Sequence, residues 1–222
     1  MIKVKVCGIT NAEDARVAVE AGADALGFIF VEGTPRFIEP AAAATIIAWL
    51  PPFVTPVGVF WDHAEGHVKA VAEQCRLGAL QFHGEETPEA LAGHRLPVIK
   101  TVKLPPASTV EGMPEFRVSE KTEVLKYSKV AAAVLLDTTA RWSEGKAREP
   151  VEWRQAATIA AAYRHKPRPQ VILSGGLTPE NVVRAIGIVK PYAVDVNSGV
   201  EASPGTKDPD KVRRFVAAAR SA

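Results

Sequence analysis

The sequence predicts a single (β/α)8 barrel, which is a closed ring of parallel strands surrounded by helices. Short apolar runs alternate with helical segments along the whole chain, and eight strand-then-helix units fit into its 222 residues. Several of the strands are apolar on both faces, as strands covered by helices are. No strands are left over for an antiparallel hairpin. A closed barrel explains this pattern better than an open sheet, because a barrel has no edge strands.

The first strand and the first helix carry clear local signals. Residues 3–7 alternate between two faces, so Lys5 and Cys7 lie on the same face. Asn11 is a suitable N-cap for a helix that ends near Gly22. The chain therefore passes from a strand to a helix within a few residues of Cys7.

The other units follow by the same signs, namely apolar runs of strand length and capped helical segments. Further strands are predicted over residues 24–30, 55–60, 79–83, 96–102, 131–136, 170–173 and 192–196. Further helices are predicted over residues 39–50, 63–75, a short segment from 87, and 120–127, 151–164, 179–188 and 208–219. Prolines and other breakers make residues 104–118 an irregular loop.

Composition excludes several classes of protein. The 27 basic and 25 acidic residues give a net charge of +2, without long runs of one sign, so neither a nucleic acid nor an acidic membrane is expected as a partner. The most apolar stretch, residues 41–50, is too short to span a bilayer. Two cysteines, Cys7 and Cys75, match no metal-site spacing and indicate a reducing compartment. We expect one domain over residues 1–222, located in the cytoplasm.

Cys7 lies where the first strand stops and a glycine turn begins. The nearby start of a helix favours a thiolate and can lower the pKa of a cysteine, which suits a nucleophile or a general base. The structural alternative is a small buried apolar side chain, which is what most single cysteines are.

Glycine turns follow the seventh and eighth predicted strands. They contain Gly175 and Gly176 in one turn and Asn197, Ser198 and Gly199 in the other. In barrels the loops after these two strands often bind phosphate through bare backbone N–H groups. Alternatively, the glycines only permit tight turns.

Other candidates also follow predicted strands. Asp137 comes directly after an apolar run, where a buried carboxyl group that keeps its proton can act as a general acid, although an aspartate there can also form a turn. Arg36 follows the second strand and offers a planar fork for a carboxylate. On the fourth strand, Gln81 and His83 share one face; His83 can orient a substrate or can be a hydrogen-bonded structural histidine.

Lys5 needs a partner if it lies inside the barrel, because an unpaired buried charge is costly. The eighth strand closes beside the first, and Asp195 shares a face with Asn197. We therefore predict an ion pair between Lys5 and Asp195 inside the barrel.

Seven motifs stand in order along the chain. They are Lys5-Val6-Cys7-Gly8-Ile9-Thr10, Pro35-Arg36, Val57-Gly58-Val59-Phe60, Leu80-Gln81-Phe82-His83-Gly84, Leu135-Leu136-Asp137, Ser174-Gly175-Gly176-Leu177, and Asp195-Val196-Asn197-Ser198-Gly199-Val200-Glu201. In these motifs the chain resembles the phosphoribosylanthranilate isomerase family of tryptophan biosynthesis along nearly its whole length.

The resemblance implies an Amadori rearrangement without a metal or a cofactor. In that family an acid protonates the furanose ring oxygen, the ring opens to a Schiff base, and a base removes the proton from the neighbouring sugar carbon. The resemblance makes Cys7 the base and Asp137 the acid, and it directs Arg36 toward the anthranilate carboxylate. The further residues expected to bind the phosphoribosyl substrate are Gln81, His83 and Asp195, with Gly175, Gly176, Asn197, Ser198 and Gly199 at its phosphate.

The chain departs from the family pattern at residues 138–150, where a charged loop containing Trp142 replaces a glycine-rich one. This departure leaves two alternatives open. One is a related phosphosugar aldose-ketose isomerase with a different aglycone, and the other is a paralogue that binds a phosphorylated ligand without catalysis. Retention of Cys7 and Asp137 argues against the second. The sequence is compatible with a monomer or a homodimer.

Overall fold

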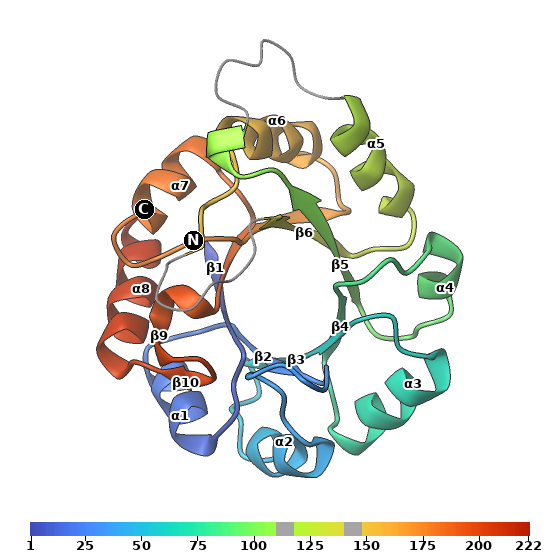
Figure 1. Cartoon of the computed structure of the whole chain (residues 1–222), viewed down its shortest axis with the longest axis vertical. Coiled ribbons are helices and arrows are strands. Elements are labelled where there is room, and N and C mark those ends of the chain that lie inside the picture. Colours follow the sequence, from blue (N-terminus) through green and yellow to red (C-terminus); the bar gives the residue numbers. More distant parts are fainter. Residues whose placement is uncertain (110–117, 140–147) are drawn as a thin grey trace.

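The computed structural model describes residues 1–109, 118–139 and 148–222. Eight parallel strands form a closed barrel in which β1 to β8 follow one another around the ring and β8 pairs with β1. The helices surround this ring (Figure 1). The (β/α)8 barrel predicted from the sequence is therefore confirmed.

The strands and helices alternate along the described chain. The barrel strands are β1 (Lys3–Cys7), β2 (Ala25–Ile29), β3 (Thr55–Phe60), β4 (Ala79–Phe82), β5 (Val98–Leu104), β6 (Ala133–Thr138), β7 (Gln170–Leu173) and β8 (Ala193–Val196). The helices are α1 (Ala12–Glu20), α2 (Pro40–Ile47), α3 (Glu65–Gln74), α4 (Pro88–Ala92), α5 (Val118–Tyr127), α6 (Trp153–Tyr163), α7 (Val182–Val189) and α8 (Pro209–Ser221).

In the part of the chain that the structure describes, four short elements lie outside this alternation. They are two 3-10 helices, η1 (Ala107–Thr109) and η2 (Ser198–Val200), and two strands, β9 (Glu201–Ser203) and β10 (Thr206–Lys207). Because β9 and β10 pair antiparallel, the prediction that no hairpin is left over is wrong. The hairpin is too short and too polar to produce the alternation that identifies a strand.

Apolar side chains fill two separate regions. Inside the barrel, small and branched side chains from six strands form one cluster: Val57, Ala79, Ile99, Ala133, Leu135, Ile172 and Ala193. A larger cluster lies between the strands and the surrounding helices. The barrel interior is thus a packed core, and the inner-face residues beyond it, at the carboxyl ends of the strands, are the ones that can reach a ligand.

Helix starts follow the capping signals in the sequence. The Asn11 side chain accepts a hydrogen bond from the Asp14 N–H (2.8 Å) at the start of α1. Asp208 accepts from the N–H groups of Asp210 and Lys211 before α8. These bonds satisfy N–H groups that lack partners within the helix.

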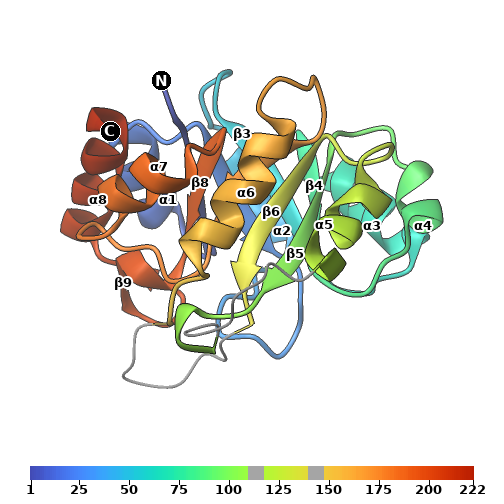
Figure 2. The same cartoon turned by 90° about the horizontal axis from the view of Figure 1, so that it is seen from above.

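The two ends of the chain meet beside β1. Arg220, in α8, donates to the carbonyl oxygens of Ile2 (2.6 Å) and Gly22 (2.9 Å) and pairs with Asp24 (2.7 Å). Figure 2 shows both termini at the same end of the molecule, while β9 lies toward the opposite end. The last helix therefore closes the ring at the first strand.

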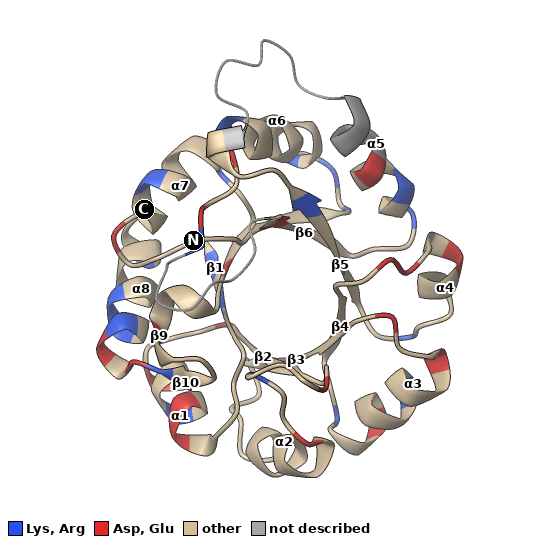
Figure 3. Ribbon diagram, in the orientation of Figure 1, with Lys and Arg blue, Asp and Glu red and all other residues tan. Residues whose placement is uncertain are grey.

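Charged residues of both signs occur around the ring of helices (Figure 3). Among the helices in the described ranges, none has both the length and the apolar character needed to cross a membrane.

Candidate active site

The barrel places a thiol and a carboxyl group at the same end. Cys7 is the last residue of β1, and Asp137 is the penultimate residue of β6. They are 4% and 3% exposed. Strands β7 and β8 separate β6 from β1 in the ring, so the two groups face the barrel mouth from different sides.

Cys7 lies against Gly27, its partner residue in β2. A Cβ atom at position 27 would be 2.6 Å from Cys7 Sγ and 3.1 Å from Lys5 Nζ, so only glycine leaves room for both groups. Burial raises the pKa of the Cys7 thiol, and the charge of Lys5 opposes this rise. The expectation that the nearby helix lowers this pKa is wrong, because burial outweighs the favourable charges.

Lys5 and Asp195 form the predicted ion pair, with Lys5 Nζ 2.8 Å from Asp195 Oδ1. The two residues are register partners in the β1–β8 pairing, and each is 4% exposed. Ser174 Oγ donates to Asp195 Oδ2 (3.3 Å). Burial alone would lower the pKa of Lys5, but the nearby Asp195 and Cys7 groups outweigh it and raise that pKa above its ordinary value.

Asp137 is contacted from two sides. Its Oδ2 lies 3.5 Å from His83 Nε2 and 3.4 Å from Arg148 Nη2, which also donates to the Thr138 carbonyl oxygen (2.9 Å). Asp137 Oδ1 is buried and has no hydrogen-bond partner among the described residues. A buried carboxylate oxygen without a partner marks a place where a substrate group can bind.

His83 is a neutral side chain at neutral pH. Burial, opposed by Asp137 and aided by Lys103, lowers its pKa from 6.5 to about 4. The His83 ring stacks on the Trp61 ring, with centroids 5.2 Å apart. Lys103 Nζ lies 4.3 Å from the centre of the same Trp61 ring. The neutral imidazole can therefore offer a hydrogen bond at the mouth without adding a charge.

Gln81 also points a polar group into the barrel. Its Nε2 donates weakly to Thr101 Oγ1 (3.5 Å), and its Oε1 is buried without a partner in the described part of the chain. Gln81 is 2% exposed. Its position supports the prediction that it contacts substrate.

Arg36 is held by Glu201, which follows β8 and the short helix η2. The guanidinium makes a bidentate contact, with Nε 2.8 Å and Nη2 2.7 Å from the two carboxylate oxygens. Lys207, fully buried in β10, also pairs with Glu201 (3.2 Å) and donates to Asn197 Oδ1 (2.9 Å). Glu201 thus fixes the orientation of the Arg36 guanidinium, which is the group predicted to bind a substrate carboxylate.

The two glycine turns lie side by side. A Cβ atom at Gly199 would overlap the Leu177 carbonyl oxygen, and one at Gly176 would lie 2.6 Å from the Arg148 carbonyl oxygen. Gly175 and Gly176 have positive φ angles of 78° and 66°. Within the described ranges, their N–H groups donate to no acceptor. Close packing and bare N–H groups are what an anion site made of backbone requires.

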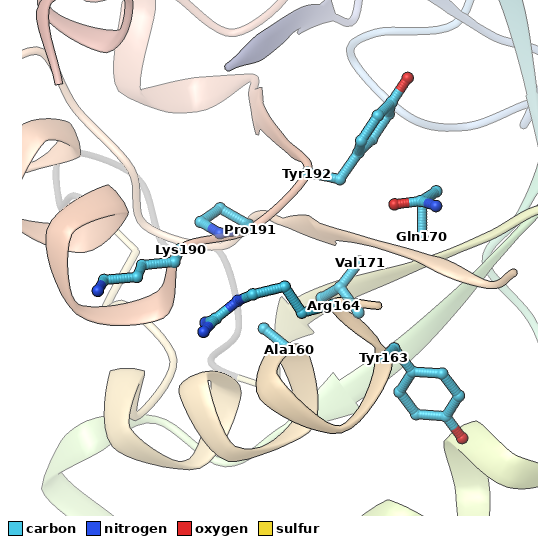
Figure 4. A pocket seen from close by; sticks show the side chains of 8 residues that line it. All are labelled: Ala160, Tyr163, Arg164, Gln170, Val171, Lys190, Pro191 and Tyr192. Carbon is cyan, nitrogen blue, oxygen red and sulfur yellow. The ribbon is translucent and has the colours of Figure 1, made fainter. Parts of the chain in front are cut away.

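A separate cavity of about 500 Å³ lies at the amino ends of β7 and β8, at the other end of the barrel from Cys7. Figure 4 shows the side chains that line it. Gln170 and Tyr192, which line it, stand at the start of β7 and just before β8. Its cations, Arg164 and Lys190, are the C-caps of α6 and α7, where a positive charge suits the helix dipole. This cavity is remote from Cys7 and is not part of the candidate site.

Comparison with known proteins agrees with this geometry. The family model described as N-(5'-phosphoribosyl)anthranilate (PRA) isomerase matches residues 4–218. A curated relative of that name from Geobacter sp. (strain M21) is 46% identical over 220 residues, which cover 99% of this chain and 98% of the relative.

The chain belongs to the PRA isomerase family.

Two solved structures of this family superimpose over the full length of both chains. Monomers derived from the dimeric PRA isomerase of Thermotoga maritima give a TM-score of 0.81 at 37% identity. A PRA isomerase in complex with reduced 1-(o-carboxyphenylamino)-1-deoxyribulose 5-phosphate also gives a TM-score of 0.81, at 39% identity.

This PRA isomerase family member has site contacts that sequence patterns did not reveal. They are the stack of Trp61 on His83, the contact of Arg148 with Asp137 and the pairing of Glu201 with Arg36, each of which joins side chains from separate segments of the chain. Of the three added partners, Trp61, Arg148 and Glu201, only Glu201 stood within a motif noted in the sequence. The other two carry no local signal, because a loop tryptophan or arginine is usually only solvated.

The loop that departs from the PRA isomerase pattern is described only in part. Residues 138 and 139 and residues 148–150 belong to the structure, whereas Trp142, Gly145 and Lys146 lie outside the described residues. The described end brings Arg148 to Asp137. The loop therefore contributes a cation beside the predicted general acid.

Proposed function

We propose that this chain converts N-(5'-phosphoribosyl)anthranilate to 1-(2-carboxyphenylamino)-1-deoxyribulose 5-phosphate. The observation that carries the proposal is the placement of a buried thiol, Cys7, and a buried carboxyl group, Asp137, at the same end of one barrel. Membership of the PRA isomerase family supplies the substrate.

In the proposed reaction, Asp137 donates a proton to the furanose ring oxygen. The bond between that oxygen and the first sugar carbon then breaks, and the nitrogen lone pair forms a Schiff base. The Cys7 thiolate removes the proton from the second sugar carbon, and the electrons move to give an enolamine that tautomerises to the ketose. An acid and a base in different surroundings suit this proton shift.

The remaining polar groups would hold the substrate on both sides of the reacting carbons. We assign the phosphate to the turns that contain Gly175, Gly176, Asn197, Ser198 and Gly199, and the anthranilate carboxylate to Arg36. The hydroxyl and amine groups between them would meet Gln81, His83 and Asp195. The unpartnered oxygens of Gln81 and Asp137 support this orientation.

The direct test is turnover of phosphoribosylanthranilate by the purified chain, followed by the loss of anthranilate fluorescence and by identification of the product. The proposal predicts turnover without added metal or cofactor. Parallel assays with phosphoribosylated amines other than anthranilate test the alternative aglycone, which the departure of residues 138–150 from the family pattern leaves open. If another phosphoribosylated amine were turned over faster than phosphoribosylanthranilate, that amine would be the substrate and the proposal would be wrong.

We propose that the chain forms a homodimer. The T. maritima relative is described as dimeric, and Phe53, between α2 and β3, is 92% exposed in the single chain. In a dimer whose contact includes Phe53, this apolar surface would be removed from water. Sedimentation velocity should give twice the mass of one chain, and a single-chain mass would refute the proposal.

We also propose that the enzyme acts in the cytoplasm. Both cysteines are free in the structure, and a reducing compartment keeps such thiols reduced. Detection of the protein in the cytoplasmic fraction of cells would support this location, and recovery in another fraction would contradict it.

A further inference from the structure

Lys5 is a buried cation that the proposed proton transfers do not use. It lies two residues before Cys7 on the inner face of β1, and its side chain is 4% exposed. Its charge is compensated by Asp195, which in turn accepts a hydrogen bond from Ser174. The desolvation penalty of a buried ammonium group can exceed the stabilisation that one ion pair provides. This cost points to a role for the Lys5 charge in the chemistry of the site.

The ammonium group and the thiol share one small space. Cys7 Sγ and Lys5 Nζ lie 2.6 Å and 3.1 Å from the point where a Cβ atom at position 27 would stand. Since residue 27 is glycine, no side chain from β2 separates them. The β1–β8 register holds Asp195 opposite Lys5, so the ammonium is fixed between a carboxylate and the thiol.

This placement answers a problem that burial creates. A thiol takes a proton from carbon only as the thiolate, and burial disfavours the thiolate. The charged groups that act on Cys7 are Lys5 from β1, Asp195 from β8 and Lys207 from β10. Lys5 exerts the largest of these effects, and it favours the thiolate.

We propose that Lys5 is a positioning residue that stabilises the Cys7 thiolate against the effect of burial, and that Asp195 fixes the Lys5 ammonium beside the sulfur. The consequence for turnover rests on the proposed function, but the effect on the thiol does not. Lys207 is a weaker second cation, because Glu201 and Asn197 already engage it.

The test measures the thiolate itself. In a Cys75→Ser background, the ultraviolet absorbance of the Cys7 thiolate is followed against pH, with the Cys7→Ser protein as the blank. Lys5→Met should move the midpoint upward by about one pH unit or more, which lowers the thiolate fraction at neutral pH about tenfold. Lys3→Met is the matched control, because Lys3 lies on the same strand, pairs with Asp24 and is half exposed. It should leave the midpoint unchanged.

A second variant guards against misfolding. Lys5→Met leaves Asp195 buried without its partner, whereas Lys5→Met combined with Asp195→Asn removes both charges together. Because Asp195 opposes the thiolate, the double variant should show a smaller upward shift. If either folded variant, checked by circular dichroism, titrates at the original midpoint, the proposal is overturned.

Turnover separates this inference from the proposed function. In an active enzyme, Lys5→Met should lower kcat with little change in KM and should move the acidic limb of the pH profile upward with the thiolate midpoint. If the unmodified chain does not turn over phosphoribosylanthranilate, the proposed function fails while the thiolate titration still decides the role of Lys5. If turnover is normal and the midpoint does not move, only the inference about Lys5 fails.

Discussion

Gly27 shows how little space surrounds the Cys7 thiol at the scale of single residues. Gly27→Ala would place a methyl group 2.6 Å from Cys7 Sγ, so the thiol or the backbone must move. We predict a loss of about 1–3 kcal/mol in the free energy of unfolding, as in other overpacked sites, and a large loss of turnover. Denaturant titration and the fluorescence assay measure the two effects.

Gly66→Ala is the matched control for that substitution. Gly66 lies in α3, and nothing stands within 4 Å of the position of its added Cβ. Alanine there should stabilise the helix by about 0.5–1 kcal/mol and leave turnover unchanged. Full activity of Gly27→Ala would show that the thiol does not need the space that glycine leaves.

His83 makes a pH-dependent contribution to stability. Its pKa is about 4 in the folded protein and 6.5 without the fold, so the unfolded state binds the proton first. The contribution of neutral His83 is therefore present above pH 6.5 and is lost as the pH falls toward 4. Stability should fall more steeply over this range in the original protein than in His83→Gln. Equal slopes in denaturant titrations of the two proteins would contradict this assignment.

Single-residue contacts differ in how far the sequence could predict them. The Lys5–Asp195 pair was predictable, because both residues lie on inner faces of strands that a closed barrel makes neighbours. The ion pair between Arg36 and Glu201 was not predictable, because the two residues are 165 positions apart and their contact depends on the hairpin after β8. The sign of the Cys7 pKa shift was also missed, because burial is a property of the assembled mouth.

At the scale of elements, apolar alternation predicted strands better than it predicted their ends. The bounds of β1, β3 and β7 match the predicted ranges, and each has a charged, glycine or proline residue close to its ends. Strand β6 runs to Thr138, whereas the sequence predicts that it ends before Asp137. The prediction misses the last two residues, Asp137 and Thr138, because they are polar although the structure buries them. A polar residue that ends a buried strand looks like a loop residue in sequence. This is common where a barrel builds a site.

Helix α8 depends on its N-cap. Asp208 accepts hydrogen bonds from Asp210 N–H (3.0 Å) and Lys211 N–H (3.1 Å), and Asp208→Ala leaves both without that partner. We predict a loss of about 0.5–2 kcal/mol in the free energy of unfolding. Because the cap makes no contact with Cys7 or Asp137, kcat should stay unchanged. A stability equal to that of the original protein in denaturant titration would show that the cap contributes nothing.

At the scale of the whole molecule, the ring joins the first strand to the last. The β1–β8 pairing and the Arg220 contacts tie the two ends of the chain together. We propose that residues 1–222 fold as one domain. Thermal unfolding followed by far-ultraviolet circular dichroism and by tryptophan fluorescence should then give coincident transitions. Two separate transitions would indicate two folding units.

The central claim is that the closed ring brings Cys7 and Asp137 together as base and acid on one substrate. Turnover of phosphoribosylanthranilate by Cys7→Ser and by Asp137→Asn tests it most directly, with Cys75→Ser as the control thiol substitution. The structure predicts that each of the first two variants folds and loses roughly 10²–10⁴-fold in kcat, while Cys75→Ser stays active. Near-normal kcat in folded Cys7→Ser or Asp137→Asn would contradict the account.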